Sequence, residues 1–397
     1  MKYDFTTVLD RNGHDIIAAD IIPFDAEVEE GFSTIPMWIA DMSFPVAPCI
    51  DKAIRERMEF PNFGYFSEPD EYFDSIISWH KLRKGVTDLT KECIGYENGV
   101  LGGVSSAITA FTCAGEKILV NSPTYVGFTH VLEDLGRPAV HSELVRDENG
   151  VWRMDFEDMD AKIKENNIHF AIFCSPHNPC GRVWERWEIE KAMEVFKAND
   201  CIVVSDEIWS DIIMPGFTHI PTQSVSEDAK QRTIAFYAPS KTFSLAGLVG
   251  SYHVVYNKYL RDRLLKQSGS THYNAANVLS VSALTGAYSP EGMAWADEMI
   301  KVIELNLDYA CGFIAENFEG VRVMRPQGTY MLFLDCSEWC KVHGVSADEL
   351  RKRGVKKGVI WQNGDDFFLR DSIRMNFALP RSLAIEAMER LKKYVFI

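Results

Sequence analysis

Five short, continuous apolar runs, separated by stretches with the period of amphipathic helices, constrain the fold of this chain more than any other feature. Unbroken apolar runs of this length are typical of strands that are buried on both faces. The runs lie at Lys117–Val120, His169–Cys174, Cys201–Ser205, Thr233–Tyr237 and Leu248–Val255. Helix-like segments such as Glu185–Ala198 fall between them. This alternation predicts an α/β fold with a mostly parallel central sheet that is covered by helices on both faces.

The pattern changes after about position 286, which predicts a second, smaller α+β domain. A long helix-like stretch, Glu291–Phe318, begins it. Two further strands and two helices follow, at Thr329–Asp335, Ser372–Leu379, Ser346–Lys356 and Ser382–Tyr394. We therefore expect a large domain over 46–286 and a small domain over 287–397. The N-terminal segment over 1–45 should pack with the small domain or reach across to a partner subunit.

The formal net charge of −16 limits the classes of partner. A chain this acidic is repelled by nucleic acid and by anionic membranes, so neither is expected. No run is long enough to span a bilayer, and the first residues lack the apolar stretch of a signal peptide. The nine cysteines show no spacing typical of a zinc site or a disulfide framework. We therefore expect no metal site and a reducing, cytoplasmic location.

Two charged residues follow apolar runs, at the carboxyl ends of predicted strands, where parallel sheets bind their ligands. Lys241 comes just after Thr233–Tyr237, and a partly buried lysine there could form an imine with an aldehyde. The alternative is a surface lysine on a loop. Asp206 follows Cys201–Ser205, where a carboxylate is costly unless a positive group faces it. A protonated pyridine nitrogen would meet that need, as would a helix N-cap or an ion pair with a protein base.

Two loops carry further candidates. Asn178 lies in a Ser-Pro-His-Asn-Pro-Cys-Gly sequence, for which a turn is the simplest interpretation. Its amide could also donate to a phenolate oxygen of a bound ring. Tyr125 follows Ser122-Pro123-Thr124, and its ring could stack on a planar cofactor or serve only in packing.

A glycine-rich segment and a late arginine complete the set. Gly99-Val100-Leu101-Gly102-Gly103 leads into a helix-like stretch, and small residues at a helix start suit phosphate. The segment matches neither the dinucleotide-binding nor the P-loop pattern, so a tight turn is the alternative. Arg374 is flanked by apolar residues in a predicted strand, where its guanidinium needs a carboxylate. A substrate carboxylate or a structural Asp or Glu would serve.

Taken in order along the chain, these motifs resemble those of the fold-type I enzymes that depend on pyridoxal 5'-phosphate (PLP), the aspartate aminotransferase superfamily. The resemblance extends over nearly the whole chain. It is carried by Ser122-Pro123-Thr124-Tyr125, Asn178-Pro179-Cys180-Gly181, Ser205-Asp206-Glu207-Ile208, Ser240-Lys241-Thr242-Phe243 and Ile373-Arg374-Met375-Asn376-Phe377. Within the superfamily, the segment Met37-Trp38-Ile39-Ala40-Asp41-Met42-Ser43-Phe44 is similar to the signature of the cystathionine β-lyase group typified by MalY and PatB.

The resemblance implies a seven-stranded sheet and a role for each candidate. Lys241 would form the internal aldimine with PLP, Asp206 would face the pyridine nitrogen and Tyr125 would stack on the ring. Asn178 and Trp209 would lie on the O3′ side, and Arg374, with Ala40, would bind the substrate. The phosphate would be held by Val100, Leu101, Gly102 and Ser240. Tyr65 would reach the phosphate and substrate of the neighbouring subunit, so a homodimer with shared active sites is implied.

Three positions depart from the family pattern. Trp209 stands where aminotransferases usually carry Tyr and the lyase group often carries His, and an indole N–H donates but cannot accept a proton. Ser244 stands where the lyase group usually has Asn. Ala238 occupies a place where aminotransferases often use a phosphate-binding Ser, which leaves more of that work to Ser240 and to backbone N–H groups.

The reaction that the resemblance implies is β-elimination from L-cystathionine or a related cysteine S-conjugate, which gives pyruvate, ammonia and a thiol. Homocysteine would be the thiol from cystathionine, as in methionine biosynthesis. An aminotransferase shares the PLP motifs and is the first alternative. A MalY-like regulatory binding protein with incidental lyase activity is the second.

Overall fold

A computed structural model describes residues 2–22, 24 and 26–397 of the chain. It divides into two compact units. The larger consists of Val46–His177 and Arg182–Asp297. The smaller consists of Met1–Pro45, Asn178–Gly181 and Glu298–Ile397, so the N-terminal segment belongs to the same unit as the C-terminal hundred residues.

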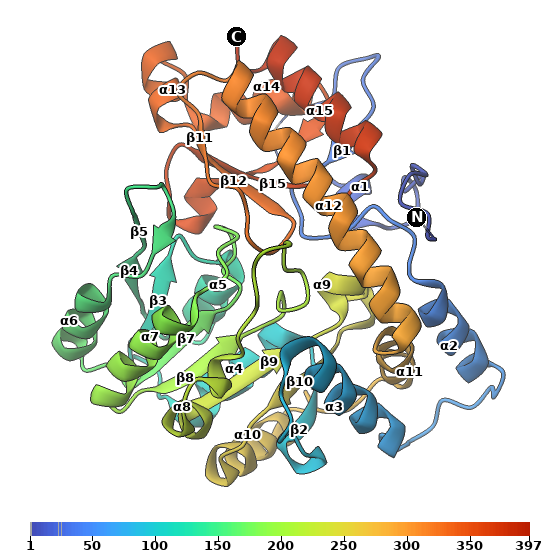
Figure 1. Cartoon of the computed structure of the whole chain (residues 1–397), viewed down its shortest axis with the longest axis vertical. Coiled ribbons are helices and arrows are strands. Elements are labelled where there is room, and N and C mark those ends of the chain that lie inside the picture. The colour runs from blue at the N-terminus through green and yellow to red at the C-terminus, as the bar shows by residue number, and fades with distance from the viewer. Residues whose placement is uncertain (1, 23, 25) are drawn as a thin grey trace. The chain divides into compact units, whose positions relative to one another are not determined.

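Within the described residues, the larger unit is built on a seven-stranded sheet (Figure 1). Its spatial order is β2 (Ile94–Asn98), β10 (Gly250–Val254), β9 (Thr233–Tyr237), β8 (Ile202–Asp206), β7 (Phe170–Cys174), β3 (Ile118–Ser122) and β4 (Ala139–Glu143). The strands from β9 to β4 pair in parallel, whereas β10 runs antiparallel to both of its neighbours. The predicted α/β class with a mostly parallel sheet is confirmed.

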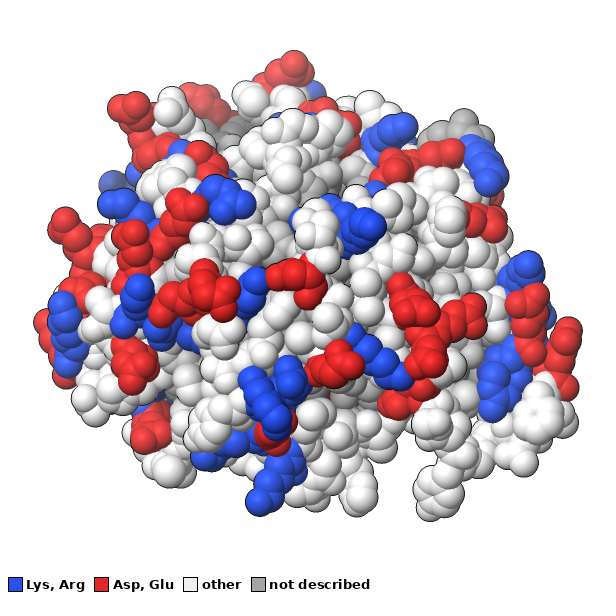
Figure 2. Space-filling view, turned by 60° about the horizontal axis from the view of Figure 1, so that its bottom comes forward, with Lys and Arg blue, Asp and Glu red and all other residues white. Residues whose placement is uncertain are grey.

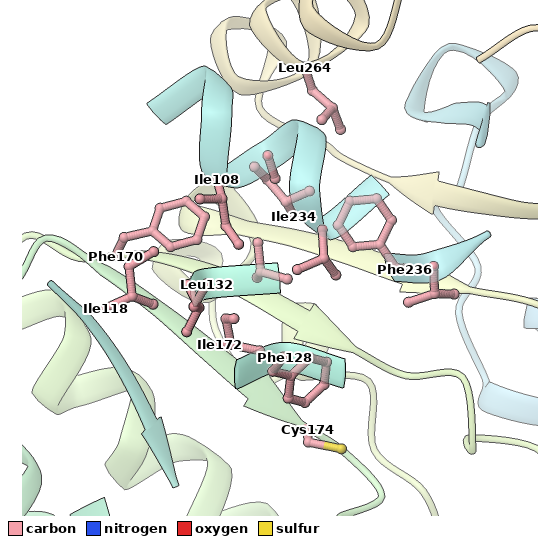
Figure 3. Close-up of a cluster of buried hydrophobic side chains, with 14 of the residues drawn as sticks. Ile108, Ile118, Phe128, Leu132, Phe170, Ile172, Cys174, Ile234, Phe236 and Leu264 are labelled. Atoms are coloured by element: carbon pink, nitrogen blue, oxygen red, sulfur yellow. The ribbon is translucent and has the colours of Figure 1, made fainter. Parts of the chain in front are cut away.

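Helices cover both faces of this sheet. On one face α4 (Val100–Phe111), α5 (Val126–Asp134) and α10 (Lys258–Ser270) pack against alternate strand residues and enclose a buried apolar core (Figure 3). On the other face α3 (Asp70–Lys84) places His80 against the ring of Tyr237, with ring centroids 4.6 Å apart. That face also receives α6 (Phe156–Asn166), where Asp158 accepts a hydrogen bond of 2.7 Å from Ser142 of β4. The remaining elements of this unit are α2 (Pro48–Met58), η1 (Lys91–Cys93), β5 (Val145–Arg146), β6 (Trp152–Arg153), α7 (Arg186–Ala198), η2 (Thr222–Ser224), α8 (Glu227–Arg232), α9 (Ser240–Phe243), η3 (Ala246–Leu248) and α11 (Val278–Ala287).

Glycine sets the start of α4 and its distance from the sheet. Gly99, the N-cap residue, has a φ of +80°, which side-chain-bearing residues rarely adopt. One turn later, a β-carbon on Gly103 would lie 2.3 Å from Cε1 of Phe236 in β9. The helix therefore packs directly on a strand ring at this point, and a residue with a side chain at 103 would push the two apart.

The smaller unit contains a four-stranded antiparallel sheet in the described part of the chain, in the order β11 (Arg322–Val323), β12 (Met331–Asp335), β15 (Ser372–Asn376) and β14 (Gln362–Asn363). Its register places Arg374 of β15 opposite both Phe333 and Gln362. The helix predicted over 291–318 is α12 (Pro290–Asn317), which is unbroken and ends in this unit. The other elements are α1 (Ile17–Asp20), β1 (Ile35–Pro36), which pairs with β13 (Val359–Ile360), α13 (Ser337–His343), α14 (Ala347–Lys356), η4 (Gly364–Phe367) and α15 (Arg381–Tyr394).

The surface carries both signs of charge. Figure 2 shows acidic and basic side chains interspersed over the face in view. Across the described ranges, no helix is both long and apolar enough to cross a bilayer. The same residues include no cluster of three or more His, Cys, Asp or Glu that could hold a metal ion.

Candidate active site

The polar segments that follow β3, β7, β8 and β9 leave the sheet at one edge, because these four strands are parallel and adjacent. Tyr125 follows β3, Asp206 is the last residue of β8, and Lys241 lies four residues beyond β9. The strand order thus brings three of the predicted site residues to the same edge of the sheet, at the carboxyl ends of its parallel strands, which is where doubly wound sheets bind ligands. All three belong to the larger unit.

Asp206 is a buried carboxylate at the end of β8. Successive side chains of a strand point to opposite faces, and Val204 lies in the core beneath α4 and α5. The side chain of Asp206, two residues later, therefore points to that same face. The N–H of Ile208 donates to its Oδ1 over 3.1 Å. Burial nevertheless raises the pKa of Asp206 to about 7, because the charged form is poorly solvated there. A cation placed against this carboxylate would therefore be strongly favoured.

Glu207, the next residue, points to the opposite face and is satisfied by the protein itself. Its carboxylate accepts from the ring of His219 over 2.8 Å and from the hydroxyl of Tyr237 over 2.7 Å, and it also accepts from Thr222 N and Ser205 Oγ. Burial, the largest single influence, would raise the pKa of Glu207, but the contacts with His219, Thr222 and Tyr237 together outweigh it and the pKa is lowered. Glu207 is not among the site residues predicted from the sequence. The signal in the sequence is the pair of acidic residues directly after an apolar strand. One of them, Glu207, is held by hydrogen bonds within the protein, and the other, Asp206, can face a ligand.

Lys241 lies in the short helix α9, directly after β9, and is partly buried. Its Nζ is 5.9 Å from the centroid of the buried indole of Trp209, within the range of a cation–π interaction. The helix ends at Ser244, whose φ of +56° is left-handed. Asn tolerates that conformation better than Ser does, which accounts physically for the Asn that the lyase group usually has there.

Tyr125 and the start of α4 meet at Gly127. A β-carbon on Gly127 would lie 2.5 Å from Cε1 of Tyr125 and 2.9 Å from Cδ1 of Leu101, so both side chains close on this glycine. Helix α4 has no side-chain cap, and its first residues are Val100, Leu101 and Gly102. The backbone N–H groups of a first helical turn have no partner within the helix, and they favour an anion. Ser240 begins α9 after β9.

In the smaller unit, Arg374 is the centre of a second group. The guanidinium is buried, and its Nη1 donates to Oδ1 of Asn178 over 3.1 Å. Its Nη2 donates to the carbonyl of Trp38 over 3.1 Å. Asn376, on the same face of β15, donates to the carbonyls of Ile39 and Asp41. Side chains of β15 thus hold the peptide segment around Ala40 beside Arg374.

Tyr65 is exposed, unlike the other predicted site residues. Its side chain is fully exposed, and it is in the larger unit, between α2 and α3. Phe60 and Phe63 in the same loop are also exposed. The role implied for Tyr65 involves a second subunit and stays a prediction.

Comparison with known proteins assigns the family. Residues 36–391 match the model of the aminotransferase class I and II family. The chain belongs to this family. Cystathionine beta-lyase PatB of Bacillus subtilis is 34% identical over 326 residues, which are 82% of this chain and 82% of PatB. Among solved structures, cystalysin from Treponema denticola, which contains pyridoxal 5'-phosphate, has a TM-score of 0.92 and 30% identity over 99% of this chain and 98% of its own. The PLP-bound C-S lyase from Staphylococcus hominis has a TM-score of 0.89 and 29% identity over 98% of each chain.

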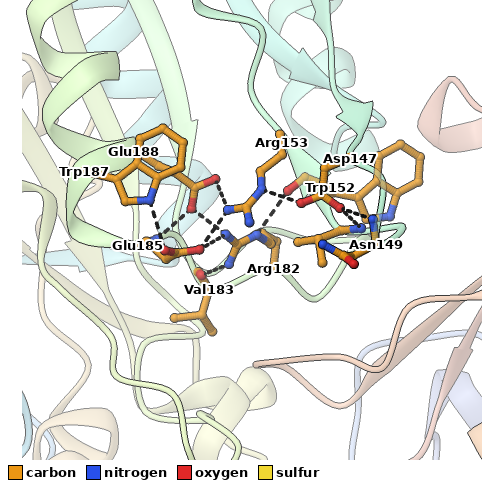
Figure 4. A network of polar contacts seen from close by, with 10 residues as sticks. Asp147, Asn149, Trp152, Arg153, Arg182, Val183, Glu185, Trp187 and Glu188 are labelled. Carbon is orange, nitrogen blue, oxygen red and sulfur yellow. Dashed lines mark hydrogen bonds and ion pairs between the residues drawn. The ribbon is translucent and has the colours of Figure 1, made fainter.

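In this aminotransferase class I and II protein, a buried ion-pair network supports the stem of the Asn178 loop. His177 and Arg182 form an isolated antiparallel bridge, with a hydrogen bond of 2.8 Å from His177 N to Arg182 O. The Arg182 side chain donates to the carboxylate of Glu188 over 2.5 Å and to the carbonyl of Trp152 over 3.1 Å (Figure 4). Arg153 donates to the other oxygen of Glu188 over 3.0 Å. Glu188 is fully buried, and the two arginines that face it compensate its carboxylate for the loss of solvent.

Replacing Glu188 with glutamine is expected to lower the free energy of unfolding by up to about 3–5 kcal/mol, the cost of removing one charge from a buried ion pair, although both arginines keep their ion pair with Glu185. Urea unfolding followed by circular dichroism measures the change. Glu190→Gln is the matched control, because Glu190 pairs with Arg186 on the exposed side of α7. An exposed pair of this kind contributes about 0–1 kcal/mol. Equal stability of the two variants would contradict a structural role for the network.

Proposed function

We propose that this chain is a PLP-dependent carbon–sulfur β-lyase that cleaves L-cystathionine or a related cysteine S-conjugate. The observation that carries the proposal is the buried Asp206 carboxylate, whose pKa is raised to about 7 by burial. It ends β8, next to the strand that leads to Lys241 and at the same edge of the sheet as the strand that leads to Tyr125. A protonated pyridine nitrogen is the cation that suits this carboxylate. The names of the relatives, cystathionine beta-lyase and C-S lyase, favour elimination over transamination.

The residues present fit PLP. Asp206 would hold the ring nitrogen, Tyr125 would stack on the ring, and Trp209 and Asn178 would serve the O3′ side. The first turn of α4, through Val100, Leu101 and Gly102, and the Ser240 hydroxyl would hold the phosphate. When bound, PLP supplies an aldehyde that joins to an amine and a cationic ring that accepts electron density.

The protein side chains would then perform the positioning and the proton transfer. Arg374 would attract and orient the substrate α-carboxylate through its guanidinium charge. Lys241 would hold the cofactor through its amine, and its Nζ would remove the proton from Cα of the substrate. Loss of the sulfur substituent from the β-carbon and addition of water would complete the net reaction, in which the substrate and one water give pyruvate, ammonia and a thiol.

The assembly and the location belong to the same proposal. The exposed aromatic side chains of Phe60, Phe63 and Tyr65 favour burial against a second copy of the chain, since apolar groups gathered in one loop mark an interaction surface. A homodimer would allow Tyr65 to reach the neighbouring active site. The nine cysteines, all in the described part of the chain, form no disulfide bonds, which suits a reducing cytoplasm.

The test is incubation of the PLP-loaded protein with L-cystathionine and no keto acid. We expect steady release of pyruvate and homocysteine in equal amounts, far beyond the concentration of enzyme. Lactate dehydrogenase with NADH measures the pyruvate, and a thiol reagent measures the homocysteine. Product formation that stops after one turnover and resumes only when a keto acid is added would instead establish an aminotransferase.

A further inference from the structure

We propose that Gln362 is a positioning residue that makes Arg374 selective for a substrate carboxylate. The proposal rests on the proposed function in one respect, the binding of the α-carboxylate by Arg374. It adds a residue on a different strand that aims the guanidinium and keeps its positive charge available.

The contact between the two side chains follows from the strand register. Gln362 in β14 pairs directly with Arg374 in β15, so both side chains lie on the same face of the small sheet. Nη2 of Arg374 donates to Oε1 of Gln362 over 2.8 Å. This hydrogen bond is shorter than those from Arg374 to Asn178 and Trp38, which are both 3.1 Å. The ring of Phe367 supports the guanidinium, with its centroid 4.5 Å from the guanidinium carbon.

These contacts fix the plane of the guanidinium. Nη2 has two hydrogens, and one is directed at Oε1 of Gln362 while the other is directed at the carbonyl of Trp38. Two directions on one nitrogen define the plane, because the guanidinium is rigid. The orientation in which a planar carboxylate would be received is therefore set before the substrate arrives.

The orientation of Gln362 itself is set by Asp366. Nε2 of Gln362 donates to Oδ2 of Asp366 over 3.1 Å. Since only the amide nitrogen donates, this bond requires that Oε1 face Arg374. The amide thus links an exposed carboxylate to the buried guanidinium without placing a negative charge on it.

The neutrality of the amide is the feature that matters for selectivity. A carboxylate at position 362 would form a charge-assisted bond with the same nitrogen and would partly neutralise the guanidinium. It would also repel the incoming substrate carboxylate. The uncharged amide of Gln362 holds the guanidinium in the same orientation and does not compete with the substrate carboxylate for its positive charge.

The experiment compares binding of L-alanine and L-alaninamide to the PLP-loaded protein, followed by the absorption of the bound cofactor. Neither compound has a sulfur to eliminate, and they differ in whether they carry a carboxylate. In Gln362→Glu we expect the affinity for L-alanine to fall about tenfold or more, on the scale of losing a charged contact, and the affinity for L-alaninamide to change less than twofold. Gln362→Met, which removes the oxygen without adding charge, should give a smaller loss for L-alanine alone.

Gln231→Glu is the matched control, because it adds the same charge at an exposed position on α8 in the other unit. It should leave both affinities unchanged. The proposal is wrong if Gln362→Glu keeps the wild-type preference for L-alanine over L-alaninamide, or if it weakens both compounds equally. Failure of the proposed lyase function would appear separately, as a wild-type protein that binds L-alanine but releases no thiol from cystathionine.

Discussion

Lys241→Ala is expected to reduce thiol release from cystathionine by about 1,000-fold or more, since a positioned general base alone contributes about 10²–10⁴-fold. The variant loses both the amine that joins the cofactor and the base that removes the Cα proton. It should also lack the absorption of covalently joined PLP. Borohydride reduction followed by peptide mass spectrometry identifies the residue that is covalently bonded to PLP. In the wild type the adduct should lie on Lys241.

Lys258→Ala provides the control, because Lys258 is an exposed lysine that pairs with Asp262 on α10. It should retain full activity and the wild-type adduct. A reduced adduct on a lysine other than 241, or near-normal turnover by folded Lys241→Ala, would refute the assignment. Circular dichroism establishes that both variants are folded.

Asp206→Asn should lower the rate of elimination by about 10²–10³-fold, which corresponds to a barrier higher by ~3–4 kcal/mol, on the scale of removing one charge from a buried pair. The amide cannot stabilise a cation, so the ring would lose the charge that draws electrons from the substrate. The same change should weaken cofactor binding. Equilibrium dialysis of PLP and steady-state assays with cystathionine measure the two effects.

The pH dependence of cofactor binding gives Asp206 a second signature. Burial raises the pKa of this carboxyl to about 7 in the cofactor-free chain, so below that pH the group takes up a proton and loses its charge. Because the proposed pair needs the ionised form, PLP affinity in the wild type should fall as the pH drops through about 7. Asp206→Asn should lose this dependence, while Asp228→Asn, on the partly exposed Asp228–Arg232 pair of α8, should keep it. A wild-type affinity that does not change between pH 8 and pH 6 would contradict the pairing.

The central strands could be predicted from the sequence, and the edge strands could not. β3, β7, β8 and β9 are continuous apolar runs, because each is buried between two neighbours and two layers of helices. β2 and β4 lie at the two edges of the sheet, and their sequences, Ile-Gly-Tyr-Glu-Asn and Ala-Val-His-Ser-Glu, are interrupted by polar residues. Glu97 of β2 is nonetheless buried, because tertiary contacts with His253 and Ser268 satisfy it. The antiparallel direction of β10 has no signature in its composition, since direction depends on the connections.

The same contrast holds for the candidate site. Asp206 and Lys241 could be placed because each follows an apolar strand, and strand ends of a parallel sheet are neighbours. Gln362 could not be placed, because β14 has only two residues and its pairing with Arg374 is a matter of tertiary register. Nor does the sequence reveal that Asn178 and Arg374 are hydrogen-bonded, since 196 positions separate them along the chain.

The contact between Gly103 and Phe236 has a consequence for how sequences of this kind can diverge. A methyl group at 103 has no room while an aromatic ring occupies 236, and a smaller residue at 236 alone would leave a void beneath α4. Each single substitution, at 103 or at 236, is disfavoured, whereas substituting both residues together can preserve the packing. We therefore expect positions 103 and 236 to covary in related sequences, with a change at one accompanied by a change at the other.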